Sequence, residues 1–171
     1  VVYPWLSCIR TMASDLEAVQ SPREVPAQVY RADARDVADV LEPESVDAVI
    51  TSPPYPNEKD YTRTTRLESV LLGFMRNRAE LQAVKRGLLR SNTRGVYKGD
   101  DDDEWVSTVP EVQRIAQAIE ERRLELGKTS GFERLYARVT KLYFGGMARH
   151  LSQLTRVLRP GARLAYVVGD Q

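Results

Sequence analysis

The sequence predicts an α/β fold with a mainly parallel sheet. Segments of strand-like composition alternate with segments of helical periodicity, which is the pattern of such folds. A near-continuous apolar run at 46–51 has the composition of a strand buried in a parallel sheet. A further apolar strand at 163–168 follows a turn expected at Pro160-Gly161. With 171 residues, the chain is long enough for one domain with a substantial core.

The N-terminal region is expected to contain a helix, a strand and a short helix in that order. Residues 4–19 carry apolar side chains at helical spacing, and Pro22 ends the pattern. The segment 27–32 is expected to be a short strand that joins the two apolar strands in one sheet. Residues 33–41 then form a short helix with Asp33 at its cap position, where a carboxylate accepts a hydrogen bond from a free backbone N–H.

The region between the two apolar strands is expected to be largely helical. Helical periodicity covers 64–90, with a break near Gly73, and it recurs around 109–126 and 130–158. The last of these helices is expected to bend at its Gly-Gly pair, Gly145-Gly146.

Composition excludes several classes of protein. The single cysteine, Cys8, excludes an internal disulfide and fits a reducing compartment such as the cytoplasm. No apolar run approaches the roughly 20 residues that span a bilayer, so no membrane partner is expected. No Cys/His cluster has metal-ligand spacing, so no zinc site is expected. The lack of a Cys-His pair also argues against nucleophilic catalysis. The one histidine, His150, is expected to be a surface or packing residue.

Charge is unevenly distributed although the net charge is only +1. Ten basic residues lie between positions 56 and 98, against four acidic ones. This excess fits either a solvated helical face or a patch that contacts phosphates. The polar segment 91–105, which contains an acidic run, is expected to be a loop with a solvated tip.

The strand at 46–51 runs directly into Ser52-Pro53-Pro54-Tyr55. Proline has no N–H and a fixed φ, so neither sheet nor helix continues through the pair. The residue before a proline is driven toward an extended backbone. The result is a stiff loop at the carboxyl end of a strand, where open α/β sheets bind their ligands.

In this setting the loop resembles the catalytic motif of the DNA amino-methyltransferases, Asp/Asn/Ser-Pro-Pro-Tyr/Phe/Trp, whose Ser form favours cytosine N4 over adenine N6. Three flanking segments are also similar to the family: ADARDVADVLEPESVDAVI, DYTRTTRLESVLLGF and LTRVLRPGARLAYVVGD. The resemblance implies a partial Rossmann-like methyltransferase fold for residues 1–171, as a single catalytic domain. Residues 62–158 would form a largely helical insertion within it.

The resemblance also implies roles for the loop. Ser52 Oγ and the Pro53 carbonyl would accept hydrogens from the target amino group, which helps a conjugated nitrogen become tetrahedral as it attacks a methyl group. Pro54 would stiffen the loop and leave no competing donor. Tyr55 would stack on a base extruded from double-stranded DNA.

S-adenosyl-L-methionine is the cofactor that the resemblance implies. Asp33 would touch its adenine, with a helix cap as the alternative role. Pro4 belongs to VVYPWLSCIRTM, which weakly resembles a cofactor-side segment of the family, with Tyr3-Pro4 in place of Asn-Pro. The first glycine of the chain is Gly73, so the family's glycine-rich loop is absent before the catalytic motif. We therefore expect that loop before residue 1 or, in a permuted order, after residue 171, and the first position is favoured.

Four residues after the motif are candidates for DNA contact: Lys59, Tyr61, Arg63 and Arg66. They would reach phosphates that flank the extruded base. Alternatively, Arg66 pairs with Glu68 or Asp60 and only orients the loop.

Two other functions stay open. One is a non-catalytic nucleic-acid-binding or structural subunit with a methyltransferase-like fold, and the missing glycine loop favours it. The other is a methyltransferase for RNA or for a protein glutamine, whose motif usually begins with Asn. A restriction endonuclease and the missing part of the catalytic domain are the expected protein partners.

Overall fold

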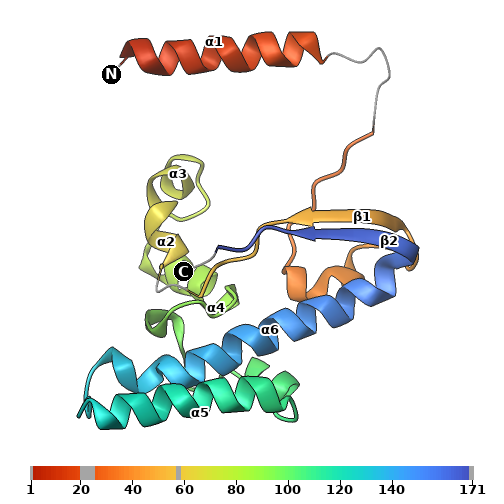
Figure 1. Cartoon of the computed structure of the whole chain (residues 1–171). Helices are drawn as coiled ribbons and strands as arrows, with labels where there is room; N and C mark the ends of the chain where they lie inside the picture. Colours follow the sequence, from red (N-terminus) through yellow and green to blue (C-terminus); the bar gives the residue numbers. More distant parts are fainter. Residues whose placement is uncertain (1, 20–25, 57–58, 170–171) are drawn as a thin grey trace. The chain divides into compact units, whose positions relative to one another are not determined.

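The computed structural model describes residues 2–19, 26–56 and 59–169 (Figure 1). The chain divides into two compact units, Val1–Arg31 and Ala32–Gln171, each of which is described by itself. Within the described residues, no helix has the length and apolar character needed to cross a bilayer.

The first unit contains helix α1 (Val2–Ala18), which confirms the helix predicted at 4–19. Its apolar side chains, among them Trp5 and Leu16, are largely exposed. The predicted end of the helical pattern at Pro22 lies outside the described residues.

The strand predicted at 27–32 is wrong, because residues 26–33 have no regular structure. Val29 is 98% exposed. Strand preference measures how well a side chain packs on a pleated, half-buried surface, and this segment lies on no such surface.

The second unit contains a two-stranded parallel sheet of β1 (Val46–Thr51) and β2 (Leu158–Tyr166). The predicted strand at 46–51 and its parallel pairing with 163–168 are confirmed, but the described sheet has two strands instead of three. Thr51 pairs with Tyr166, so both strands end at the same edge. A parallel pair with helices between its strands is compatible with part of a methyltransferase fold.

Two details of the sheet differ from expectation. Pro160 and Gly161 lie inside β2, where the register shifts as a bulge, and Gly161 takes the positive φ of 83°. β1 is also less buried than its apolar composition suggests, since Ile50 is 84% exposed. No described layer covers that face of the sheet.

Helices fill the chain between β1 and β2, as predicted. The helical stretch predicted at 64–90 contains two helices, α3 (Arg66–Leu71) and α4 (Arg78–Gly87), and a short helix α2 (Tyr61–Thr64) precedes them. The predicted break is confirmed at Gly73, which has a φ of 76°. The two later helices are α5 (Pro110–Glu125) and α6 (Tyr136–Val157).

Helix α6 organises the core of this unit. It continues without interruption through Gly145-Gly146, where a bend was expected. Figure 1 shows α5 beside α6 and running in the opposite direction. The 3-10 helices η1 (Ala34–Asp39) and η3 (Asp102–Val106) also pack on α6. The buried apolar residues come mainly from α5, α6 and η3: Met75, Val106, Val112, Ala116, Val139, Leu142, Tyr143, Leu154 and Val157.

The acidic run is not a solvated tip, which corrects the expectation for 91–105. Asp102 is only 5% exposed and pairs with Arg35 at 2.5 Å. Asp100 accepts two hydrogen bonds from the buried Arg90 guanidinium, at 2.8 and 2.7 Å. These carboxylates anchor the loop because arginines of the same unit meet them in its interior.

Candidate active site

The Ser52–Tyr55 loop starts where β1 ends and is tied to the chain just after β2. Val167 N–H donates to the Thr51 carbonyl at 2.9 Å, which prolongs the pairing by one residue. Ser52 Oγ donates to the Val167 carbonyl at 3.2 Å and lies 3.3 Å from Tyr55 Oη. The serine hydroxyl and the tyrosine hydroxyl therefore meet beyond the carboxyl ends of both strands.

Gly169 lies against the ring of Tyr55. A Cβ at position 169 would stand 2.8 Å from two ring carbons, so glycine permits this approach. The backbone N–H of Tyr55 donates to Tyr61 Oη at 3.1 Å. The ring of Tyr55 thus packs against Gly169, whereas its main chain is held by a hydrogen bond to Tyr61.

A third tyrosine lies near enough to these two to interact with them electrostatically. Tyr143 belongs to α6 and is only 6% exposed. Burial raises the pKa of Tyr143, and the neighbouring Tyr61 and Tyr55 raise it further. Its hydroxyl therefore stays protonated well into the alkaline range.

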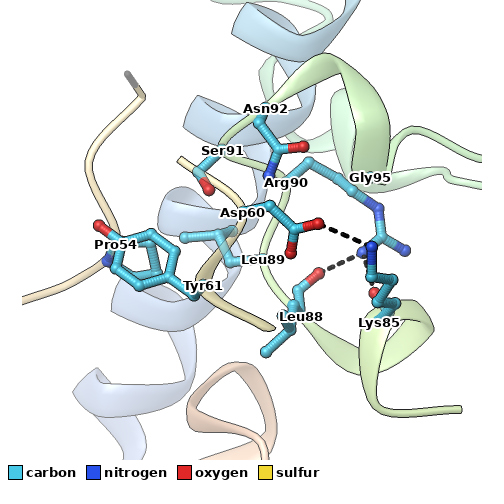
Figure 2. Close-up of a pocket in the computed structure, with 10 residues that line it drawn as sticks. All are labelled: Pro54, Asp60, Tyr61, Lys85, Leu88, Leu89, Arg90, Ser91, Asn92 and Gly95. Carbon is cyan, nitrogen blue, oxygen red and sulfur yellow. Dashed lines mark hydrogen bonds and ion pairs between the residues drawn. The ribbon is translucent and has the colours of Figure 1, made fainter. Parts of the chain in front are cut away.

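Asp60 connects helix α2 to helix α4. Its carboxylate caps α2 by accepting from Thr62 N–H at 3.1 Å and from Thr62 Oγ1 at 2.6 Å. Lys85 Nζ of α4 donates to the same carboxylate at 2.7 Å (Figure 2). Burial alone would raise the pKa of Asp60, but the hydrogen bonds from Lys85 and Thr62 outweigh it and lower the pKa.

A small pocket lies between the motif loop and the segment that follows α4. Pro54 and Tyr61 line one part of it, and Ser91, Asn92 and Gly95 line another (Figure 2). Its volume is about 40 Å³, room for water rather than for a nucleobase. Asn92 is 8% exposed and donates through Nδ2 to the Lys59 carbonyl at 3.1 Å, while its Oδ1 has no hydrogen-bond partner among the described residues.

The predicted DNA-contact residues divide into two groups. Lys59, Arg63 and Arg66 are exposed, and no ion pair joins them to a described residue. Tyr61 instead points its hydroxyl at the main chain of the motif. Because Asp60 pairs with Lys85, the alternative pairing of Arg66 with Asp60 is not found.

The two predicted cofactor residues lie in different units. Pro4 is an exposed residue of α1. Asp33 caps η1 by accepting from Arg35 N–H at 2.9 Å, and its Oδ2 pairs with the Arg35 guanidinium at 2.6 Å. Burial would raise the pKa of Asp33, but Arg35 outweighs it and lowers the pKa. The capping role of Asp33 is confirmed, and its cofactor role stays a prediction.

His150 is a packing residue, as predicted. Its Nδ1 donates to the Ala34 carbonyl at 2.7 Å, and its Nε2 lies 2.7 Å from Tyr166 Oη. It thereby joins α6 to η1 and to the end of β2. Within residues 2–19, 26–56 and 59–169, no group of three or more His, Cys, Asp or Glu side chains could hold a metal ion.

Sequence reasoning missed four residues near the loop or near Tyr61: Lys85, Asn92, Tyr143 and Gly169. All four lie far from the motif along the chain, and nothing in the local sequence of the first three links them to it. Gly169 had a signal, since a glycine after an apolar strand often marks a close approach.

Comparison with known proteins gives distant relatives of one kind. The chain is 25% identical over 180 residues to the type II methyltransferase M.BsoBI of Geobacillus stearothermophilus, covering 95% of this chain and 35% of that protein. It is 30% identical over 147 residues to type II methyltransferases M.AvaI of Nostoc sp. and Anabaena variabilis, covering 83% of this chain and 29% of each.

The chain thus spans about a third of the length of the curated relatives it matches. No family model matches it, and no solved structure matches it. The similarity to type II methyltransferases supports a methyltransferase family for this chain.

Proposed function

We propose that this chain carries the base-binding part of the catalytic site of a DNA amino-methyltransferase. The observation that carries the proposal is the Ser52–Tyr55 loop at the carboxyl end of β1, with the two hydroxyls 3.3 Å apart. The similarity to type II methyltransferases supports DNA methylation as the reaction. Residues 1–171 would form one partial catalytic domain, with 62–158 as its helical insertion.

Ser52 is oriented to accept a hydrogen bond from a substrate. Because its hydroxyl hydrogen is directed at the Val167 carbonyl, lone pairs of Oγ remain for an amino group. The Pro53 carbonyl would accept the second amino hydrogen. Acceptors fixed in advance stabilise the transition state because they need no rearrangement as the amino nitrogen becomes tetrahedral.

Tyr55 would stack on the extruded base. Gly169 limits the movement of its ring, and the Tyr61 hydroxyl holds its main chain. Stacking and hydrogen bonds to the base edge would recover part of the few kcal/mol that extrusion costs. The serine form of the motif favours cytosine N4 over adenine N6 as the target.

The cofactor side is less complete. S-adenosyl-L-methionine, when bound, would supply the methyl group. Asp33 and Pro4 are the candidates for contact with it, but Arg35 already occupies the Asp33 carboxylate, and the first glycine of the chain is Gly73. Further residues would therefore have to complete the cofactor site, as the missing part of the catalytic domain.

Lys59, Arg63 and Arg66 would contact phosphates of double-stranded DNA, with Tyr61 beside them. Exposed cations without described ion pairs are available for this role. A restriction endonuclease would be a functional partner in a cytoplasmic restriction-modification system.

The test is methyl transfer from labelled S-adenosylmethionine to duplex DNA, followed by identification of the modified nucleoside. N4-methylcytosine is the expected product, and N6-methyladenine would reverse the base assignment. A chain that binds DNA but neither binds the cofactor nor transfers methyl groups, even with the rest of its domain, would support the non-catalytic subunit instead.

A further inference from the structure

We propose that Tyr61 is a positioning residue that holds the Ser52–Tyr55 loop in its working conformation. This proposal rests on the function proposed above. The Tyr61 hydroxyl accepts a hydrogen bond from the backbone N–H of Tyr55 at 3.1 Å. A bond to the main chain of the motif is a different role from phosphate contact.

The composition of the loop makes this hydrogen bond important. Pro53, Pro54 and Pro56 have no N–H, so Ser52 and Tyr55 are the only backbone donors in the run 52–56. Tyr55 N–H is therefore the only main-chain donor beyond Ser52 by which this stretch can be held. Tyr61 accepts from it.

Tyr61 is itself held by buried groups. It is the first residue of α2, and the cap of that helix, Asp60, has a side chain only 8% exposed and paired with Lys85. On the other side of Asp60, the carbonyl of Lys59 accepts from the buried Asn92. The side chains of Lys85 and Asn92 thus anchor Asp60 and Lys59, the two residues that precede Tyr61. Figure 2 shows Asp60, Lys85 and Asn92 around the pocket beside Tyr61.

The arrangement forms a continuous line of support from α4 to the catalytic serine. Lys85 fixes Asp60, Asp60 fixes the start of α2, and Tyr61 fixes Tyr55, whose hydroxyl lies 3.3 Å from Ser52 Oγ. Loss of the Tyr61 hydroxyl leaves the Tyr55 N–H without an acceptor and lets the loop move. A displacement of about 1 Å at a reacting group can cost on the order of a hundredfold in rate.

The first experiment measures amide hydrogen exchange at Tyr55 in the 171-residue chain. Tyr61→Phe keeps the ring and removes only the hydroxyl, and the Tyr55 amide should then exchange at least about tenfold faster, since it has lost its hydrogen bond. Tyr97→Phe is the matched control, because the Tyr97 hydroxyl donates to the Gln82 side chain, at 3.4 Å, and not to the motif loop. Equal exchange at Tyr55 in wild type and Tyr61→Phe would overturn the proposal whether or not the protein is a methyltransferase.

The second experiment measures steady-state methylation by the active protein, completed by the rest of its domain where activity requires it. Tyr61→Phe should lower kcat roughly ten- to a hundredfold and leave the KM for DNA unchanged, whereas Tyr97→Phe should match wild type. A higher KM for DNA with an unchanged kcat would overturn positioning and make Tyr61 a DNA contact. A wild-type protein without methylation activity would contradict the proposed function alone, since the exchange experiment still decides whether Tyr61 holds the loop.

Discussion

Gly145 of α6 lies directly against the main chain of Asp102. A Cβ at position 145 would stand 1.8 Å from the Asp102 carbonyl oxygen and 2.5 Å from the carbonyl carbon. Real atoms cannot approach so closely, and a backbone carbonyl cannot rotate away as a side chain does. The packing of η3 on α6 therefore requires glycine at this position. The helix is continuous through Gly145-Gly146, and the missing side chain at Gly145 lets the main chain of η3 approach it closely.

Gly145→Ala should lower the free energy of unfolding by about 2 kcal/mol or more, because overpacking next to a backbone forces the two elements apart. The better helix propensity of alanine, about 1 kcal/mol, offsets only part of this. Chemical denaturation of both proteins measures the difference. Gly87→Ala is the control, since nothing lies within 4 Å of a Cβ at position 87. Equal stability of the two variants would contradict the packing described.

Ser52→Ala should reduce methyl transfer by the active enzyme by on the order of 10²–10³, because the transition state then lacks one fixed acceptor. Stability should change little, since Ser52 is exposed. The measurement is the single-turnover rate at saturating cofactor. Ser107→Ala, which removes an exposed hydroxyl that donates to the Glu104 carbonyl at 2.8 Å, should keep the wild-type rate. Near-normal turnover of Ser52→Ala would remove Ser52 from the mechanism.

Replacement of Arg63 and Arg66 by alanine should weaken binding to specific and random duplexes alike, because the phosphates that these arginines would bind carry no sequence information. The slope of log K against log salt should flatten by roughly 0.9 for each phosphate that the variant no longer neutralises. Titration at several salt concentrations measures this slope.

The control for the arginine variant is the double substitution Arg122→Ala and Arg156→Ala. It removes the same charge from exposed positions on α5 and α6, where the side chains bond to Glu125 and Gln153. An unchanged slope with a lower melting temperature would instead show that Arg63 and Arg66 orient the loop. A loss of binding confined to one target sequence would show that an arginine reads a base edge.

Acid should destabilise this protein partly through Asp100. Burial would raise the pKa of Asp100, but hydrogen bonds from Arg90 and from the Tyr97 N–H outweigh it and lower the pKa below its usual value of 3.8. A carboxylate with a lowered folded pKa contributes stability that is present above the unfolded pKa and is lost as the pH falls through the folded pKa.

Urea unfolding between about pH 6 and about pH 3 measures this contribution. Wild type should lose more stability over that range than Asp100→Asn, because asparagine does not titrate. Asp100→Asn should be the less stable of the two near neutral pH, since it leaves the buried Arg90 without its carboxylate. Parallel pH profiles of the two proteins would show that Asp100 does not contribute.

Local chemistry alone determined several features of this protein. The prolines after Thr51 end β1 whatever surrounds them, because they lack an N–H and fix φ. Asp33 caps η1 because its carboxylate reaches a backbone N–H two residues away. Gly73 interrupts the helical stretch at 64–90 because it takes a positive φ that other residues rarely adopt. Each of these needs only neighbours in the chain.

Tertiary structure decided the rest, because the deciding partners are distant in sequence. Residues 27–32 have strand-forming composition, but a strand exists only where another strand accepts and donates its hydrogen bonds. The acidic run has the composition of a solvated tip, but Arg35 and Arg90 pair with two of its carboxylates, Asp102 and Asp100, in the interior of the unit. The fold also turns the Tyr61 hydroxyl toward the Tyr55 N–H, a contact that the local sequence of Tyr61 does not reveal, whereas its predicted contact with DNA stays a prediction. A charged or hydroxyl group can satisfy its hydrogen bonds with water or with a buried partner, and the net difference is only about 0.5–1.5 kcal/mol for a typical bond, so its local sequence does not determine which of the two it meets.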